Sequence, residues 1–269
     1  MTALAPAPAA QRGHTVPHAR LSFARVVRSE YLKLFTVRST WWSLAVTAAL
    51  AVGIATLIAF ASREFVGDYN PVMAILAPMQ FTSLVAGILG AIAITGEYST
   101  GMIRSTLTAE PRRGAVLLAK AIVIATVVAA LTVVTTALSV LVVTPIAGAD
   151  AFAWGEFDQL LAPLLLSLAA MASFALLGLG WGFIIRNGAG AIATTVGILF
   201  VLPIVISLFA IGGEAWQWAY DLNQYLPLNA AATITTPDAD GFGPALATVL
   251  AWPAGALALG WIVLRGRDA

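Results

Sequence analysis

The chain has 269 residues, is 60% hydrophobic and only 10% charged, and contains no cysteine. This composition excludes a soluble domain of this length and indicates a polytopic membrane protein. The missing cysteines exclude disulfides and thiolate metal sites, and both histidines, His14 and His18, lie in the N-terminal tail. We therefore expect no histidine- or cysteine-based metal or catalytic site in the body of the chain.

Two segments precede the first long apolar run. Residues 1–20 are rich in Ala and Pro without apolar periodicity, so we predict a disordered cytoplasmic tail rather than a signal peptide. Residues 21–40 predict an amphipathic interfacial helix whose polar face carries Arg25 and Lys33, with Glu30 beside it. The alternative is an ordinary basic flank of a first span, which explains the charges but not the faces. The predicted apolar face consists of Phe23, Val27, Tyr31 and Leu34.

Six apolar runs are each long enough to cross a bilayer as a helix, which takes about 20 residues. The sequence therefore predicts an all-α fold with a six-helix transmembrane domain over residues 41–265. The predicted spans are 41–61, 72–95, 115–144, 160–185, 189–211 and 244–264. The third would be about 45 Å long at 1.5 Å per residue, so it must tilt or protrude from the membrane.

The distribution of basic residues predicts the orientation. With the N-terminus inside, every Lys and Arg of the 14 in the chain except Arg63 falls on the cytoplasmic side, and most acidic residues fall outside. Basic residues concentrate in cytoplasmic segments of membrane proteins. We therefore expect a multi-pass plasma membrane protein with both termini in the cytoplasm.

The middle of the spans offers little chemistry. No Asp, Glu, Lys, Arg or His lies mid-span, which argues against a proton- or sodium-coupled carrier, a voltage sensor, an ion channel or an intramembrane enzyme. Hydroxyl side chains and Gln80 remain, and they suit hydrogen bonds between helices, or alternatively a path for an amphiphilic substrate. No phosphate-binding loop is present. We expect no enzyme activity, cofactor, metal or nucleic acid partner in this chain, and ATP, if used, must bind to another chain.

The loop between the second and third spans, Gly96 to Lys120, carries the clearest local pattern. Ser99 and Thr100 are typical caps for a short helix, and Pro111 would end it. An apolar stripe would lie along that helix and must be covered. It could lie against the protein's own membrane domain, but we favour a docking surface for a separate protein. The stripe consists of Met102, Ile103, Thr106 and Leu107.

The segment before the last span, residues 212–243, has no Lys or Arg but several aromatic residues. Aromatic residues suit the outer membrane interface or a re-entrant pair of short helices, with Leu226 and Pro227 at the turn between them. A loop merely packed on the helix bundle is the alternative.

Three motifs together resemble the permease subunits of type-2 ABC transporters, and of bacterial exporters in particular. The first is the R-S-E-Y-x-K-L pattern of Arg28 to Leu34, which leads into a span that starts at Trp41 and Trp42. The second and most specific is the run from Gly96 to Arg104 after the second span. The third is the Pro111-Arg112-Arg113 corner before a span that carries Lys120 in its first turns.

The resemblance covers residues 22–265 and implies an exporter permease that dimerises with a second permease copy, alike or different. It also implies a separate cytoplasmic ATPase, docked on the loop after the second span and on the interfacial helix. Carried over, the docking and coupling residues would be Glu97, Tyr98, Gly101, Met102, Ile103, Arg104, Leu107, Arg112 and Arg113. A membrane scaffold or sensor that anchors a cytoplasmic partner through the same loop is the alternative, and a neighbouring gene for an ATPase would discriminate the two.

Overall fold

A computed structural model describes residues 22–63 and 70–266, and within these ranges it contains helices and no strands. The predicted disordered tail lies outside the described residues. Six helical segments are long and apolar enough to cross a membrane, which confirms the predicted all-α architecture. They are Arg38–Ser62, Pro71–Thr100, Arg113–Ala147, Phe157–Ile185, Gly188–Gly212 and Phe242–Gly266.

Three of these segments are single helices, α2 (Arg38–Ser62), α6 (Arg113–Ala147) and α12 (Phe242–Gly266). The other three are interrupted by short irregular turns, mostly next to prolines, because proline has no backbone N–H to continue the helical ladder. The interrupted segments consist of α3 (Pro71–Leu76) with α4 (Met79–Thr100), of a π-helical turn at Phe157–Leu161 with α7 (Ala162–Ile185), and of α8 (Gly188–Val196) with α9 (Leu202–Ser207).

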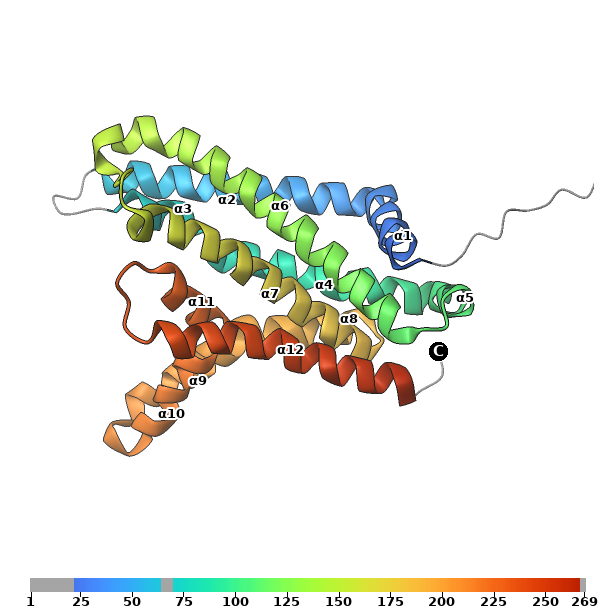
Figure 1. Cartoon of the computed structure of the whole chain (residues 1–269). Coiled ribbons are helices and arrows are strands. Elements are labelled where there is room, and N and C mark those ends of the chain that lie inside the picture. The colour runs from blue at the N-terminus through green and yellow to red at the C-terminus, as the bar shows by residue number, and fades with distance from the viewer. Residues whose placement is uncertain (1–21, 64–69, 267–269) are drawn as a thin grey trace, which may run out of the picture.

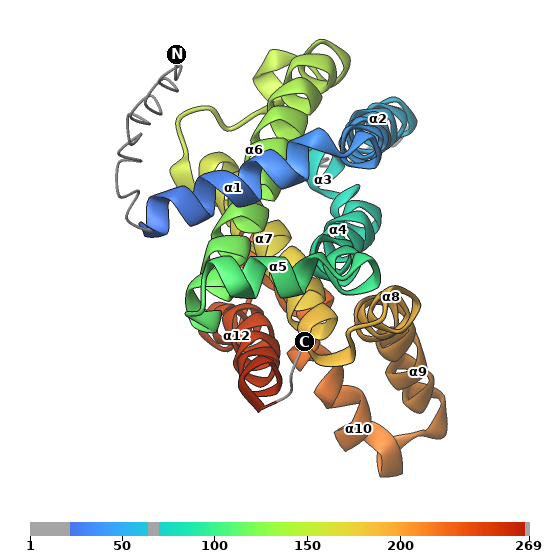
Figure 2. The ribbon, with the colours of Figure 1, turned by 90° about the vertical axis from the view of Figure 1, so that its right-hand side faces the viewer.

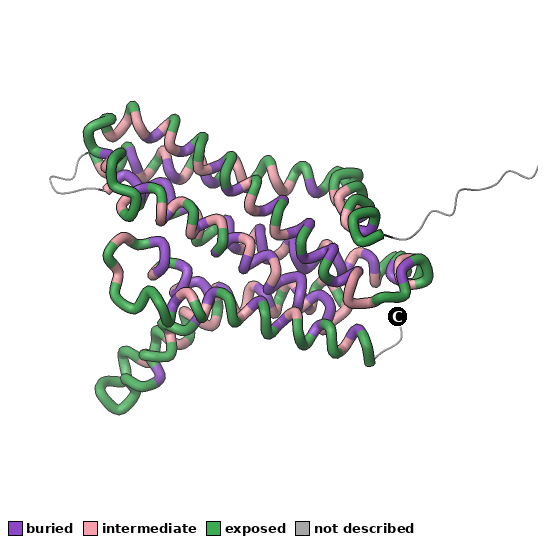
Figure 3. Tube along the Cα trace, viewed as in Figure 1, coloured by how far each residue is buried: buried purple, intermediate pink, exposed green. Residues whose placement is uncertain are grey.

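The core forms around α7, which packs between α4, α6 and α12 (Figure 1). Figure 3 shows buried residues along the facing sides of these helices, whereas α2, α9 and α12 have long exposed stretches. Phe174 and Leu177 of α7 are completely buried. Two glycines let α4 and α7 touch backbone to backbone, since a Cβ on Gly178 would lie 1.9 Å from the carbonyl oxygen of Gly87. The apolar middle of the bundle is therefore built from these close helix crossings.

Helix α1 (Phe23–Thr36) lies across one end of the bundle, roughly perpendicular to the spans (Figures 1 and 2). The faces predicted for it need a correction. Val26 and Glu30 are the residues that α1 buries, Lys33 turns toward the bundle, and Phe23 is 40% exposed. The apolar face was predicted from the spacing of residues within α1 alone. The face that is buried contains Glu30, because Glu30 pairs with Lys120 of another helix.

Short helices α10 (Gln217–Asp221) and α11 (Pro227–Thr235) connect the fifth and sixth spans at the opposite end of the bundle. Pro227 is the first residue of α11, and Leu226 before it is extended, as the residue before a proline prefers to be. Most of α11 is buried against α7 and α12. Leu226 and Pro227 thus open a helix that folds back into the bundle, and its re-entry into the membrane stays a prediction.

Candidate functional site

The turn between α4 and the loop helix α5 (Met102–Ala109) is made by Gly101. Its φ of 72° is left-handed, a conformation that glycine adopts without steric cost. Gly101 is itself the N-terminal cap of α5, and the predicted capping by Ser99 and Thr100 was wrong. Both hydroxyls donate to the carbonyl oxygen of Gly96 inside α4. Gly101 is therefore both the last cap of α4 and the first cap of α5, so the two helices follow each other directly.

The apolar stripe of α5 is covered by the protein's own helices. Ile103 is 2% exposed and lies in a buried apolar cluster, against which Leu107 packs. The cluster also contains Ile94 of α4, Leu117 of α6, Phe183 of α7 and Leu264 of α12. The expectation that a separate protein covers this stripe was wrong for Ile103, because residues of four spans supply the apolar cover. The exposed face of α5 consists of Met102, Arg104, Ser105, Thr108 and Ala109.

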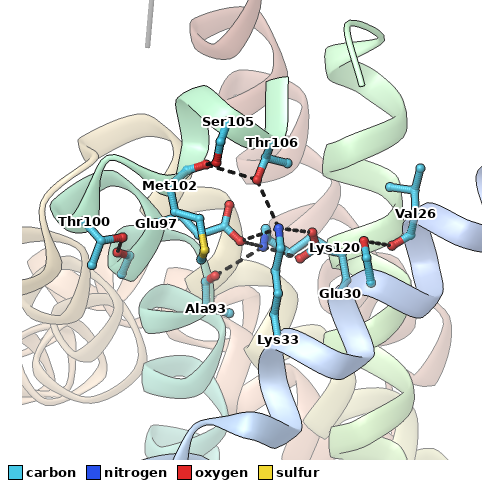
Figure 4. A network of polar contacts seen from close by, with 12 residues as sticks. Val26, Glu30, Lys33, Ala93, Glu97, Thr100, Met102, Ser105, Thr106 and Lys120 are labelled. Carbon is cyan, nitrogen blue, oxygen red and sulfur yellow. Dashed lines mark hydrogen bonds and ion pairs between the residues drawn. The ribbon is translucent and has the colours of Figure 1, made fainter. Parts of the chain in front are cut away.

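Four charged side chains meet beneath α5 (Figure 4). Glu97 at the end of α4 accepts hydrogen bonds from Lys33 of α1 at 3.0 Å and from Lys120 of α6 at 2.8 Å, both on Oε1. Glu30 of α1 accepts from Lys33 at 2.7 Å and from Lys120 at 2.5 Å. Lys33 also donates to the Thr106 hydroxyl of α5 at 3.1 Å. This ion cluster (Glu30, Lys33, Glu97 and Lys120) therefore joins α1, α4, α5 and α6.

The ion cluster is deeply buried. Glu30, Glu97 and Lys120 are each 3% exposed, and the side chain of Lys33 is 28% exposed. Two carboxylates and two ammonium groups carry no net charge together, which is the condition for burying ions without an uncompensated charge. Glu97 Oε2 is nevertheless buried without a hydrogen-bond partner among the described residues.

Both groups of α1 titrate away from neutral pH. Burial alone would raise the pKa of Glu30, but the charge of Lys120 and the hydrogen bonds from Lys120 and Lys33 outweigh it, so the pKa is lowered from 4.5. Burial alone would lower the pKa of Lys33, but its hydrogen bond to Glu30 and the charges of Glu30 and Glu97 raise it above 10.5. Both residues stay charged at every pH between these two values.

The docking of α1 should accordingly be constant between about pH 5 and pH 10. The contribution of Glu30 is present above 4.5 and is lost as the pH falls through its lowered pKa. That of Lys33 is present below 10.5 and is lost as the pH rises through its raised pKa. Because the chain has no cysteine, a fluorophore on Ser29→Cys reports the docking, with the same label on Ser62→Cys of α2 as a control. A transition of the α1 label alone between pH 6 and 8 would contradict this assignment.

Other predicted coupling residues lie around the ion cluster rather than in it. The guanidinium of Arg186 lies 5.2 Å from the centre of the Tyr98 ring. Arg112 pairs with Glu110 at 2.8 Å, and Arg113 donates to the carbonyl oxygen of Leu264 at 2.6 Å, at the end of α12. The contacts of Tyr98 and Arg113 hold the loop ends onto the bundle, whereas the pair of Arg112 and Glu110 lies within the loop.

The other residues predicted on α1, Val27, Tyr31 and Leu34, lie outside the ion cluster. The Tyr31 hydroxyl bonds to that of Thr126 in α6, while Val27 and Leu34 are half-buried. Together with Glu30 and Lys33 they place α1 against α6 and α4.

The sequence interpretation singled out Glu30, Lys33 and Glu97 but treated Lys120 only as a basic residue near the start of a span. The signal that could have found the cluster is the presence of one charge of each sign on the predicted interfacial helix, Glu30 and Lys33, and of one at the end of each neighbouring span, Glu97 and Lys120. Within residues 22–63 and 70–266, no three His, Cys, Asp or Glu side chains are grouped to hold a metal ion. The two carboxylates of the cluster instead bind ammonium groups, so the arrangement joins helices.

Comparison with known proteins identifies the family of the chain. No curated protein matches the chain. The family model described as "ABC-2 family transporter protein" matches residues 21–269, a range that includes α1, the loop helix and all six spans. Permeases of this family are generally non-catalytic membrane subunits that work with an ATPase subunit. The chain belongs to the ABC-2 transporter family, as a multi-pass membrane permease.

Proposed function

We propose that this permease forms the translocation path of an ATP-driven exporter as a dimer, and that it couples to a separate cytoplasmic ATPase through α5 and α1. The observation that carries the proposal is the ion cluster, because it joins these two helices to the spans α4 and α6. A force applied to α5 would thereby reach two spans at once.

The distribution of basic residues supports an ATPase at the end of the bundle that carries α1 and α5. Helices α1 and α5 lie at the end of the bundle where α12 ends (Figure 2), and this end also carries Arg104, Arg112 and Arg186. Basic residues favour the cytoplasmic side. We infer that α1 and α5 face the cytoplasm and lie within reach of a soluble partner.

The proposed motion follows from the way the helices are joined. Closure of two ATPase subunits around ATP would displace α5, and α1, α4 and α6 would move with it as one body. Nucleotide binding can shift such an equilibrium only by its differential affinity for the two states. The second permease copy would contribute the other half of the path. Among the six candidate spans, the fifth has the smallest share of buried residues, which leaves a long apolar face for lipid or for that copy.

The test addresses the exposed face of α5. The hydroxyls of Ser105 and Thr108 donate to carbonyl oxygens of their own helix, those of Met102 and Arg104. Ser105→Glu with Thr108→Glu should therefore leave the fold unchanged and place two carboxylates in the proposed interface. Each unpaired buried polar group costs about 1–3 kcal/mol, so capture of an ABC-type ATPase from native membranes should fall at least tenfold.

Thr236→Glu supplies the matched control. Thr236 is an exposed threonine at the opposite end of the bundle whose hydroxyl also bonds within its own helix, and its substitution should leave capture unchanged. Mass spectrometry identifies the captured protein by its nucleotide-binding motifs. Absence of such an ATPase from the wild-type sample would overturn the proposal and favour a scaffold or sensor.

A further inference from the structure

A small polar cavity lies between α2, α4, α6 and α7, within the membrane-spanning part of the bundle. Half of the residues that line it carry a hydroxyl group, and none of them is charged. Its volume is about 30 Å³. A cavity needs about 10–15 Å³ to hold one water molecule, whereas small-molecule sites typically measure about 300–1,000 Å³. The cavity therefore has room for about two water molecules and is too small for an organic ligand.

Two hydroxyl groups of α6 that line the cavity lack a partner. A Ser or Thr hydroxyl inside a helix commonly donates to a carbonyl oxygen three or four residues earlier in the same helix. Thr47 and Ser167 do so at 2.7 Å, and Thr135 does so at 3.1 Å. Thr136 and Ser139 make no hydrogen bond to any residue that the structure describes. Their hydroxyls are thus free to donate to something that occupies the cavity.

The hydroxyl of Ser139 faces the cavity. Within the described residues, the unpaired side-chain oxygens that are closed off on all sides are Glu97 Oε2, Tyr98 Oη and Asn223 Oδ1. Ser139 Oγ is not one of them, so it keeps accessible surface although the residue as a whole is only 2% exposed. Because Ser139 lines the cavity and is otherwise enclosed by its neighbours, this surface opens into the cavity. A buried hydroxyl without a partner is destabilising, and the cavity is where a partner can bind.

The chemistry of the lining selects a neutral occupant. An ion in the cavity would be buried without a counter-charge, which is costly inside a protein and inside a membrane. The hydroxyl oxygens of Thr47 and Ser167 donate to their own helices but can still accept a hydrogen bond. A water molecule can accept from Ser139 of α6 and donate to a hydroxyl oxygen of another helix. It thereby finds the two to four polar partners that a buried water molecule requires.

We propose that this cavity binds about two water molecules, which accept from Ser139 and Thr136 and link α6 to its neighbouring spans. The second span is interrupted beside the cavity at Pro78, which lines it and has no N–H to continue the helical ladder. Bound water thus joins the spans at the point where one of them is broken. This goes beyond the proposed function and needs no ATPase.

Brief X-ray radiolysis of the purified full chain in nanodiscs tests the proposal, because bound water then yields hydroxyl radicals that oxidise the nearest side chains. Met171 lines the cavity and is 4% exposed, and mass spectrometry should find it oxidised to the sulfoxide. A radical scavenger confined to the bulk water should reduce oxidation of Met102, which is 40% exposed, at least tenfold. The same scavenger should reduce oxidation of Met171 less than about twofold. Absence of oxidation at Met171, or equal quenching at both methionines, would overturn the water site.

Ser139→Val should remove the unpaired hydroxyl, fill the cavity and reduce oxidation of Met171 at least tenfold. The matched control is Ala137→Val, which adds methyl groups to the same helix at an exposed position outside the cavity and should leave the oxidation unchanged. Ala51→Val fills the cavity from α2 while keeping every hydroxyl, and it serves if Ser139→Val does not fold. Full oxidation of Met171 in both cavity-filling variants would overturn the site.

A comparison of salts distinguishes water from a bound cation. The midpoint of thermal unfolding should be the same in sodium, potassium and choline chloride at equal ionic strength. A higher midpoint in sodium chloride that disappears in Ser139→Val would assign the cavity to sodium and overturn the assignment to water. Neither result depends on an ATPase, so the water site and the proposed coupling can fail separately.

Discussion

Lys120→Met should detach α1 from the bundle and cost about 3–5 kcal/mol of stability, the range for removing one partner of a buried ion pair. Methionine fills much of the same space, but Glu30 and Glu97 would lose their shared ammonium group and the ion cluster would acquire a net negative charge. We expect a lower midpoint of thermal unfolding in detergent and a loss of ATPase capture. Arg265→Met, which also replaces a basic side chain by methionine but at an exposed position, should alter stability by less than about 1 kcal/mol.

A second substitution separates lost charge balance from lost packing. Glu30→Leu combined with Lys120→Met removes one charge of each sign and leaves the pair of Lys33 and Glu97 at 3.0 Å. Replacing both members of a buried pair with apolar residues is often neutral or stabilising. The double variant should therefore recover more than half of the stability that Lys120→Met loses. If the two single losses simply add, the charges do not interact as a unit and the ion cluster does not hold α1.

The number of spans could be predicted from the sequence because each depends on a continuous apolar run, a local property. The helix of the loop after the second span could be located for the same reason. The buried face of α1 could not be predicted. Lys33 binds Glu97, which lies 64 positions away, and Lys120 binds Glu30, which lies 90 positions away. Periodicity within one helix carries no information about such partners, so a lysine that is normally exposed was assigned to the polar face.

The apolar stripe of α5 shows the same limit. The helical spacing of its apolar residues predicted that Ile103 is buried. It did not predict which part of the protein, or which partner, buries it. The cover comes from a cluster that includes Phe183 and Leu264, residues of the fourth and sixth spans that only the folded bundle brings together with α5. The sequence therefore singled out Glu30, Lys33 and Glu97 as candidate residues. It did not predict which of them contact one another. Glu97 was assigned to coupling from family resemblance, and its two lysine partners were found in the structure.

Some glycines of the spans lie at close helix contacts, whereas others have open space beside them. Gly90→Ala should disrupt the bundle, because the added Cβ would lie 1.8 Å from the carbonyl oxygen of Ala175 in α7. A backbone atom cannot rotate away as a flexible side chain can, so the whole of α4 must separate from α7. Overpacking typically costs about 1–3 kcal/mol and occasionally more, and we expect a value at the upper end here.

Gly53→Ala is the matched control for that change, since the same Cβ on α2 meets nothing within 4 Å. It should keep or slightly raise the midpoint of thermal unfolding, because alanine favours a helix by about 1 kcal/mol over glycine. Both variants add one methyl group inside an apolar span, so hydrophobicity and membrane insertion change equally. A difference between them measures the α4–α7 crossing alone. Equal midpoints would mean that these helices can move apart freely, and α4 could then not carry a displacement of α5 into the core.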